Sequence, residues 1–209
     1  MHEEVLTKNT KSVLDALNAS GIIKNFYLAG GTALALYFGH RFSIDLDWFA
    51  EKFNYTLYFR RQLEKLGKLG IDNESKNTFN GALNGVKLSF FEYPYLPITP
   101  KSKYKENVYV AGIPDIAAMK METIGSRGSY KDFIDIYFLL QNYSLEDILG
   151  FVRQKFTNID YNEAHLLKAL TYFKDAKGTA MPQLIKQVSW QEVTGAIRRN
   201  VETYLKNLR

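Results

Sequence analysis

The sequence predicts an α+β protein with a mixed α/β sheet in the first half of the chain and helices in the second half. Two observations lead to this fold class: segments with strand character end at Asn107–Ala111, and the patterns from Asp115 onward are helical. We expect a core of mixed sheet with flanking helices over residues 1–112 and a helical region over residues 113–209. With 209 residues, 46% of them hydrophobic, the chain can bury a substantial core.

Composition and charge exclude several classes of protein. The absence of cysteine excludes disulfides, thiolate metal sites and a cysteine nucleophile. The three histidines, His2, His40 and His165, lack the spacing of metal ligands. Since no run of about 18 apolar residues occurs, we expect a soluble, cytoplasmic protein with no membrane partner. The net charge of +5 suits a nucleotide or nucleic-acid partner, although ordinary solubility charge explains it equally well.

A glycine turn follows the first expected strand, Phe26–Ala29. Gly30 and Gly31 stop this strand, because glycine adopts turn conformations that other residues take only at a cost. Thr32 is the expected N-cap of a helix that runs to Gly39. Such a turn presents backbone N–H groups and the positive end of a helix dipole, so it is a candidate anion site.

Two carboxylates lie on the next expected strand, Ser43–Phe49. The period of two places Asp45 and Asp47 on one face of the strand, roughly 7 Å apart. Two carboxylates this close repel each other, which favours a cation between them. A lone glycine pair is usually a turn, and a lone Asp-x-Asp is usually a solvated strand face. The two motifs in this order are much more specific than either one alone.

Two amphipathic helices are expected on either side of this segment, over Asn9–Ser20 and Asn54–Leu69. The second has a basic side that is either a candidate RNA surface or a solvated helix face. A hairpin of strands Ile71–Phe79 and Val86–Tyr93 is expected next, since the segment between them contains two Asn-Gly pairs. A small basic loop follows it, with Lys101, Lys103 and Lys105.

Four charged side chains mark a second candidate region, Asp115–Leu140, in which Asp115 is the expected N-cap. Lys120 and Arg127 are seven residues apart and share one expected helical face. Asp132 and Asp135 share a face of the next helix. This set is either a structural salt-bridge cluster or half of an active site. Three more helices are expected, with Ser144 as the cap of the first: Leu145–Phe156, Asn162–Phe173 and Trp190–Leu208.

The glycine turn and the Asp-x-Asp strand together resemble the signature of the polymerase-β-like nucleotidyltransferase superfamily. The string GGTALALYFGHRFSIDLDWF resembles more narrowly the AbiEii/AbiGii-type toxin nucleotidyltransferases, and AMKxxxIxxRGxxKDFIDIYFLL is similar to later motifs of that family. The resemblance covers about Phe26–Leu140. It implies a nucleotidyltransferase-like N-terminal core and a C-terminal helical region that completes the active site and caps the core.

The resemblance also implies an activity. The enzyme would transfer a nucleoside monophosphate from an NTP to an acceptor hydroxyl with Mg²⁺ or Mn²⁺ as cofactor. The implied acceptor is RNA, in particular tRNA. The implied biological role is that of the toxin of a type IV-like toxin–antitoxin or abortive-infection system for phage defence, with a cognate antitoxin protein as partner.

Roles for individual residues follow from the resemblance. Asp45 and Asp47 would hold the metal ion and act in catalysis. Lys120 would neutralise triphosphate charge, Asp132 would be the general base or a positioning acid, and Asp135 would be structural. The residues expected to bind the nucleotide are Gly30, Gly31, Thr32, Ser43, Lys120 and Arg127.

The third metal ligand is left open by the sequence. In the superfamily a third carboxylate often comes from a hairpin strand, and the only acid along VKLSFFEYPY is Glu92. The alternation places Glu92 and Ser89 on opposite faces, with Ser89 at the position where an acid would stand. Two alternatives are therefore a small-molecule nucleotidyltransferase of the antibiotic-modifying kind and an inactive member that binds RNA or a partner protein.

Overall fold

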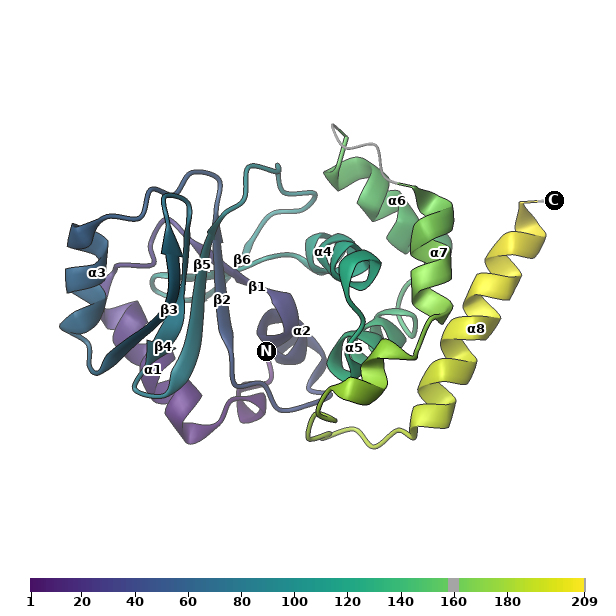
Figure 1. The fold of residues 1–209 in the computed structure, drawn as a ribbon, viewed down its shortest axis with the longest axis horizontal. Helices are drawn as coiled ribbons and strands as arrows, with labels where there is room; N and C mark the ends of the chain where they lie inside the picture. Colours follow the sequence, from purple (N-terminus) through teal and green to yellow (C-terminus); the bar gives the residue numbers. More distant parts are fainter. Residues whose placement is uncertain (158–161, 209) are drawn as a thin grey trace. The chain divides into compact units, whose positions relative to one another are not determined.

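The computed structural model of the chain describes residues 1–157 and 162–208, which form two compact units (Figure 1). The first unit is Met1–Gly112 and the second is Ile113–Arg209. Each unit is described by itself below.

The strands of the first unit form one seven-stranded sheet within the described residues, in the order β3-β4-β5-β2-β1-β7-β6. The pairs β1–β7 and β2–β5 are parallel, and the other neighbours are antiparallel. The predicted mixed sheet is therefore confirmed. The strands are β1 (Tyr27–Ala29), β2 (Leu46–Ala50), β3 (Leu69–Ser75), β4 (Thr78–Leu83), β5 (Val86–Glu92), β6 (Ser102–Lys105) and β7 (Val108–Val110).

One face of the sheet is the core of the first unit. Leu46, Trp48 and Phe90 point to this face and are fully buried. The ring of Phe59 packs edge-on against Phe90 with 5.0 Å between centroids. Figure 1 shows α1 (Lys8–Ser20) and α3 (Leu57–Glu64) on this side and α2 (Gly30–Phe38) on the other. A short 3-10 helix, η1 (Glu3–Val5), precedes α1.

The second unit is helical over its described residues. Buried apolar faces of α4 contact α5, α6 and α7, and Lys155 ties α6 to α4 through Asp115, with 2.7 Å between Nζ and Oδ1. None of the described helices is long and apolar enough to span a membrane. The elements are α4 (Ile113–Ser126), α5 (Tyr130–Leu139), α6 (Leu145–Lys155), α7 (Glu163–Thr171), the 3-10 helix η2 (Asp175–Gly178) and α8 (Trp190–Asn207).

The expected hairpin is three strands instead of two. Asn84 and Gly85, with positive φ values of 50° and 80°, form the turn between β4 and β5. The other Asn-Gly pair lies inside β4, where a Cβ at Gly81 would overlap the carbonyl oxygen of Gly70. This glycine therefore permits close approach of two backbones, and it does not make a turn. The strand β6 occupies most of the segment predicted as a basic loop, and α3 is shorter than predicted.

Two predicted helix caps are wrong. Helix α2 begins at Gly30 with Ala29 as its N-cap, so Thr32 lies inside the first turn. Helix α4 begins at Ile113, which places Asp115 in the first turn with its carboxylate bonded to Lys155. In both cases the side chain that the local pattern predicts as a cap is hydrogen-bonded to a residue distant in the sequence. By contrast, Ser144 caps α6 as predicted, by accepting from the Asp147 N–H.

Candidate active site

Asp47 lies at the centre of the first unit's sheet. Strand β2 begins at Leu46, so Asp45 directly precedes the strand and Asp47 lies within it, a later start than predicted. The register pairs Asp47 with Ala29 of β1 on one side and with Ser89 of β5 on the other. Asp45 and Asp47 are both half-buried. The position of Asp47 is thus fixed by strand pairing on both sides, whereas Asp45 lies one residue before the paired strand.

The glycine turn meets the carboxylate of Asp47. Gly30 has φ of 67°, and a Cβ built on it would come within 3.0 Å of Asp47 Oδ2. The missing side chain therefore makes room for this carboxylate at the start of α2. By helix geometry the N–H groups of Gly30, Gly31 and Thr32 have no acceptor within α2, so this helix end can receive an anion.

Buried hydroxyl groups link the turn to Asp45. The Thr32 hydroxyl donates to the backbone carbonyl of Asp45 and lies 2.7 Å from Ser43 Oγ. Arg41 donates from Nη1 to Ser43 Oγ at 3.3 Å and to the Phe42 carbonyl at 3.1 Å. Thr32, Arg41 and Ser43 are all at most 5% exposed. These hydroxyls hold the backbone that carries Asp45, which is a different role from the phosphate contact expected of them.

Removal of the Thr32 hydroxyl should destabilise the first unit. Valine keeps the shape of threonine but deletes the group that bonds both Ser43 and Asp45. We expect Thr32→Val to lower the free energy of unfolding by about 1–3 kcal/mol, measured by urea denaturation. Thr32→Ser keeps the hydroxyl and should cost about 1 kcal/mol or less for the lost methyl group. Equal stability of Thr32→Val and wild type would contradict the role assigned to this hydroxyl.

The register places Glu92 away from Asp47. Glu92 pairs with Ala50, whereas Ser89 pairs with Asp47, so the side chain of Glu92 lies on the opposite face of the sheet. Its carboxylate accepts from the Phe53 N–H and from Asn77 Nδ2, each at 3.2 Å. Ser89 is buried and stands where a third acid would stand.

The donor set around Asp47 fits a hard divalent cation. Among the described residues no group of three or more histidine, cysteine or acidic side chains could hold a metal ion. Two carboxylates nonetheless suit Mg²⁺, which is usually bound by one or two carboxylates together with substrate phosphates and water. The space left at Gly30 next to Asp47 Oδ2 agrees with such a site.

The second unit contains a buried cluster of three charged residues, here called the Lys120 triad (Lys120, Asp132 and Asp135). Lys120 Nζ lies 2.9 Å from Asp132 Oδ1 and 2.7 Å from Asp135 Oδ2. The three residues are at most 6% exposed. Ser129 donates its hydroxyl to Asp132 Oδ2 at 2.5 Å, in a capping box at the start of α5. The triad thus joins α4 to α5 and carries one net negative charge.

Acid should weaken the fold through Asp132. Burial raises the pKa of this carboxyl, but the charge of Lys120 and the hydrogen bond from Ser129 outweigh it, so the net pKa is below the ordinary 3.8. A lowered pKa stabilises the folded state above the unfolded-state value, and this stability is lost as pH falls through the folded-state pKa.

We therefore expect the free energy of unfolding of the wild type to fall below about pH 4, and to fall less steeply in Asp132→Asn. Urea denaturation between about pH 6 and pH 3 measures both slopes. The variant Asp72→Asn, which changes an exposed carboxyl on β3, should keep the wild-type slope. Parallel curves for wild type and Asp132→Asn would contradict the assignment.

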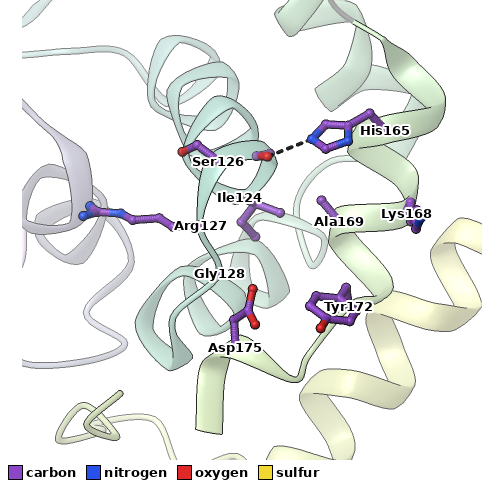
Figure 2. A pocket seen from close by; sticks show the side chains of 10 residues that line it. Ile124, Ser126, Arg127, Gly128, His165, Lys168, Ala169, Tyr172 and Asp175 are labelled. Atoms are coloured by element: carbon purple, nitrogen blue, oxygen red, sulfur yellow. Dashed lines mark hydrogen bonds between the residues drawn. The ribbon is translucent and has the colours of Figure 1, made fainter. Parts of the chain in front are cut away.

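Arg127 lies apart from the Lys120 triad. It follows the end of α4 and is exposed, whereas Lys120 is buried in the same helix, so the shared face predicted for them is not formed. Among residues 1–157 and 162–208, its guanidinium makes no hydrogen bond or ion pair. Arg127 lines a groove of about 440 Å³ between α4 and α7, where His165 Nε2 donates to the Gly125 carbonyl at 2.8 Å. Figure 2 shows its side chain extending away from α7.

Arg41 and Ser129 are supporting residues that were not predicted from the sequence. A buried arginine two residues before a buried serine is a signal for a polar network, since arginine is rarely buried without partners. The position of Ser129 three residues before Asp132 matches the spacing of a capping box.

The class of enzyme to which the chain belongs is shown by its match to a family of known proteins. A sequence model described as "Nucleotidyl transferase AbiEii toxin, Type IV TA system" matches residues 12–203. The chain therefore belongs to the AbiEii family of toxin nucleotidyltransferases, as the sequence motifs predicted. It is 38% identical over 207 residues to the protein aq_aa25 of Aquifex aeolicus (strain VF5), covering 97% of this chain and 98% of that one.

Two solved structures share the fold. A protein of H. pylori, solved as a candidate nucleotidyltransferase, matches with a TM-score of 0.57 at 16% identity, over 100% of this chain and 99% of its own. MenT4, a nucleotidyltransferase toxin from Mycobacterium tuberculosis H37Rv, matches with a TM-score of 0.51 at 12% identity, over 97% and 87% of the two chains. At these identities the likeness concerns the fold.

Proposed function

We propose that the chain transfers a nucleoside monophosphate from an NTP to a hydroxyl of RNA, with tRNA as the acceptor, in the presence of Mg²⁺ or Mn²⁺. The observation that carries this proposal is the Asp47 carboxylate held against Gly30 at the start of α2, two residues after Asp45. Phosphates and a divalent cation are the groups that such a pair of elements can receive together.

Asp45 and Asp47 would hold the metal ion, which supplies Lewis-acid stabilisation of phosphate charge. The backbone N–H groups of Gly30, Gly31 and Thr32 would bind the triphosphate. Arg41, Ser43 and the Thr32 hydroxyl keep Asp45 in place through the contacts described above.

The second unit is proposed to contribute Lys120 and Asp132. Lys120 is bonded to two carboxylates, so its nearest effect is to keep Asp132 ionised. An ionised Asp132 is the form that can accept a proton or orient a hydroxyl. Since both Asp132 oxygens are engaged by Lys120 and Ser129, we place it as a positioning acid. Arg127, with no partner among the described residues, is proposed to contact nucleotide phosphate.

The biological role that fits the family is that of a toxin paired with an antitoxin, in abortive infection or phage defence. Expression of the wild type should arrest growth, and expression of Asp47→Asn should not. Co-expression of a cognate antitoxin should restore growth. Equal growth arrest by the wild type and Asp47→Asn would show that toxicity does not depend on nucleotide transfer.

The biochemical test is incubation with each of four NTPs labelled at the α-phosphate, with Mg²⁺ or Mn²⁺, and with a choice of acceptors. The acceptors are total tRNA, unrelated RNA, a hydroxylated amino sugar, and none. Label on tRNA supports the proposal and names the nucleotide. Label on the amino sugar alone would indicate a small-molecule enzyme, and RNA binding without any transfer would indicate a binding protein.

A further inference from the structure

Aromatic residues occupy one complete row of the sheet in the first unit. The register pairs Phe91 of β5 with Phe49 of β2, Phe49 with Tyr27 of β1, and Tyr27 with Tyr109 of β7. Residues paired in register on neighbouring strands point to the same face. We call this set the aromatic row (Phe91, Phe49, Tyr27 and Tyr109). It crosses four adjacent strands on the face that carries Asp47.

Three rings of the row contact one another, and lysines lie beside the row. The Phe49 ring lies 6.0 Å from Tyr27 in a stacked arrangement and 5.3 Å from Phe91. Lys101 Nζ lies 4.6 Å from the centre of the Tyr27 ring. Lys103, which pairs with Tyr109 across β6 and β7, is exposed. Phe91, Phe49 and Tyr27 therefore form a connected aromatic cluster, and Tyr109 continues it in the strand register at the end where the lysines lie.

Burial distinguishes this row from the core. On the same strands, Trp48 and Phe90 point to the opposite face and are fully buried. Three members of the row, Phe49, Phe91 and Tyr109, are only half-buried, whereas Tyr27 between them is 7% exposed. Rings that remain partly exposed beside lysines are typical of surfaces on which bases stack, because every base offers a flat π-face and carries phosphate nearby.

The position of the row relative to Asp47 suggests its ligand. Phe49 follows Asp47 by two residues on the same face, a separation of roughly 7 Å along the strand. In a nucleotide, one ribose separates the α-phosphate from the base. We infer that the aromatic row is a stacking platform for the base of the nucleotide whose phosphate lies at Asp47. This inference rests on the proposed function, because it takes Asp47 as the place of the phosphates. The base is therefore that of the NTP, and an unpaired base of the RNA acceptor is the alternative that the test distinguishes.

Binding measurements on matched variants of the full chain test this inference. Phe49→Leu keeps an apolar side chain but removes the ring, whereas Phe49→Tyr keeps the ring. Tyr109→Leu is a second test at a half-exposed position. Tyr58→Leu is the control, since Tyr58 is 73% exposed on α3, which lies on the other side of the sheet.

Two dissociation constants are measured: that of a non-hydrolysable NTP with Mg²⁺, and that of a single-stranded oligoribonucleotide without NTP. Loss of one stacked base should raise the affected constant about 5- to 140-fold in the leucine variants. Phe49→Tyr and Tyr58→Leu should bind like wild type. A rise in the NTP constant supports the inference, and a rise in the RNA constant alone would contradict it, because the platform would then hold a base of the acceptor.

Unchanged constants in both leucine variants, with melting curves that show folded protein, would overturn the inference. Equal losses in Phe49→Leu and Phe49→Tyr would also overturn it, because they would indicate packing instead of stacking. The two binding measurements need no catalytic turnover, so they are independent of the proposed nucleotide transfer. If the leucine variants lose affinity although the wild-type protein transfers no label, the proposed transferase activity is refuted and the stacking platform is retained.

Discussion

Asp47→Asn should reduce the rate of nucleotide transfer at least about 10³-fold, because the metal ion and its carboxylate ligands would stabilise the transition state by several kcal/mol. The substitution removes one negative charge and keeps the shape of the side chain. Asp47 lies half-buried against Gly30, so the fold should lose no more than about 1 kcal/mol. The rate of label transfer and the urea denaturation midpoint measure the two effects separately.

Asp45→Asn should have a comparable effect, and the double variant should be little worse than either single one, since residues that act as a unit are not additive. Asp72→Asn, on the exposed edge strand β3, should transfer at the wild-type rate. Binding of Mn²⁺, followed by electron paramagnetic resonance, should weaken in Asp47→Asn. Transfer at the wild-type rate by Asp47→Asn would refute the carboxylate site.

Lys120→Met should destabilise the second unit by about 3–5 kcal/mol, because it leaves two carboxylates buried without their cation. Asp132 and Asp135 are at most 1% exposed, so water cannot compensate for the lost charge. The same variant should also lose transfer activity, since an uncompensated Asp132 takes up a proton more readily. Urea denaturation at neutral pH measures the stability, and label transfer measures the activity.

Neutralising the whole triad separates the two effects. The triple variant Lys120→Met, Asp132→Asn, Asp135→Asn should recover much of the stability while remaining inactive. Lys11→Met, which breaks an exposed ion pair with Glu3, should change stability little. A Lys120→Met protein as stable as wild type would show that the triad does not hold α4 to α5.

The sequence was sufficient for the mixed sheet and for most helices because their periodicity is strong and local. It was not sufficient where a contact between residues distant in the sequence determines the local structure. Gly81 lies in a strand because Gly70 of the neighbouring strand comes close to it, and a single Asn-Gly pair carries no sign of that neighbour. The local pattern predicts Asp115 as a cap, and it gives no sign of the ion pair because the partner, Lys155, lies 40 residues away in the sequence.

For the candidate site, the sequence predicts which residues to consider and, in part, their contacts, while their roles stay a prediction. The alternation along β5 correctly separates Ser89 from Glu92, since the period of a strand is fixed by geometry. The hydroxyl of Thr32 turns inward to Asp45, which no local rule indicates. The aromatic row depends on the register of four strands, with two of their three pairings parallel, and this register is not encoded in any short segment.

The most direct test of nucleotidyl transfer compares NTP labelled at the α-phosphate with NTP labelled at the γ-phosphate, each incubated with wild-type protein, Mg²⁺ and tRNA. Transfer of a nucleoside monophosphate predicts that the α label joins the RNA and that the γ label is released as pyrophosphate. A γ label on the RNA would indicate phosphoryl transfer instead. Either that result, or RNA that carries no label from either NTP, would contradict the proposed reaction.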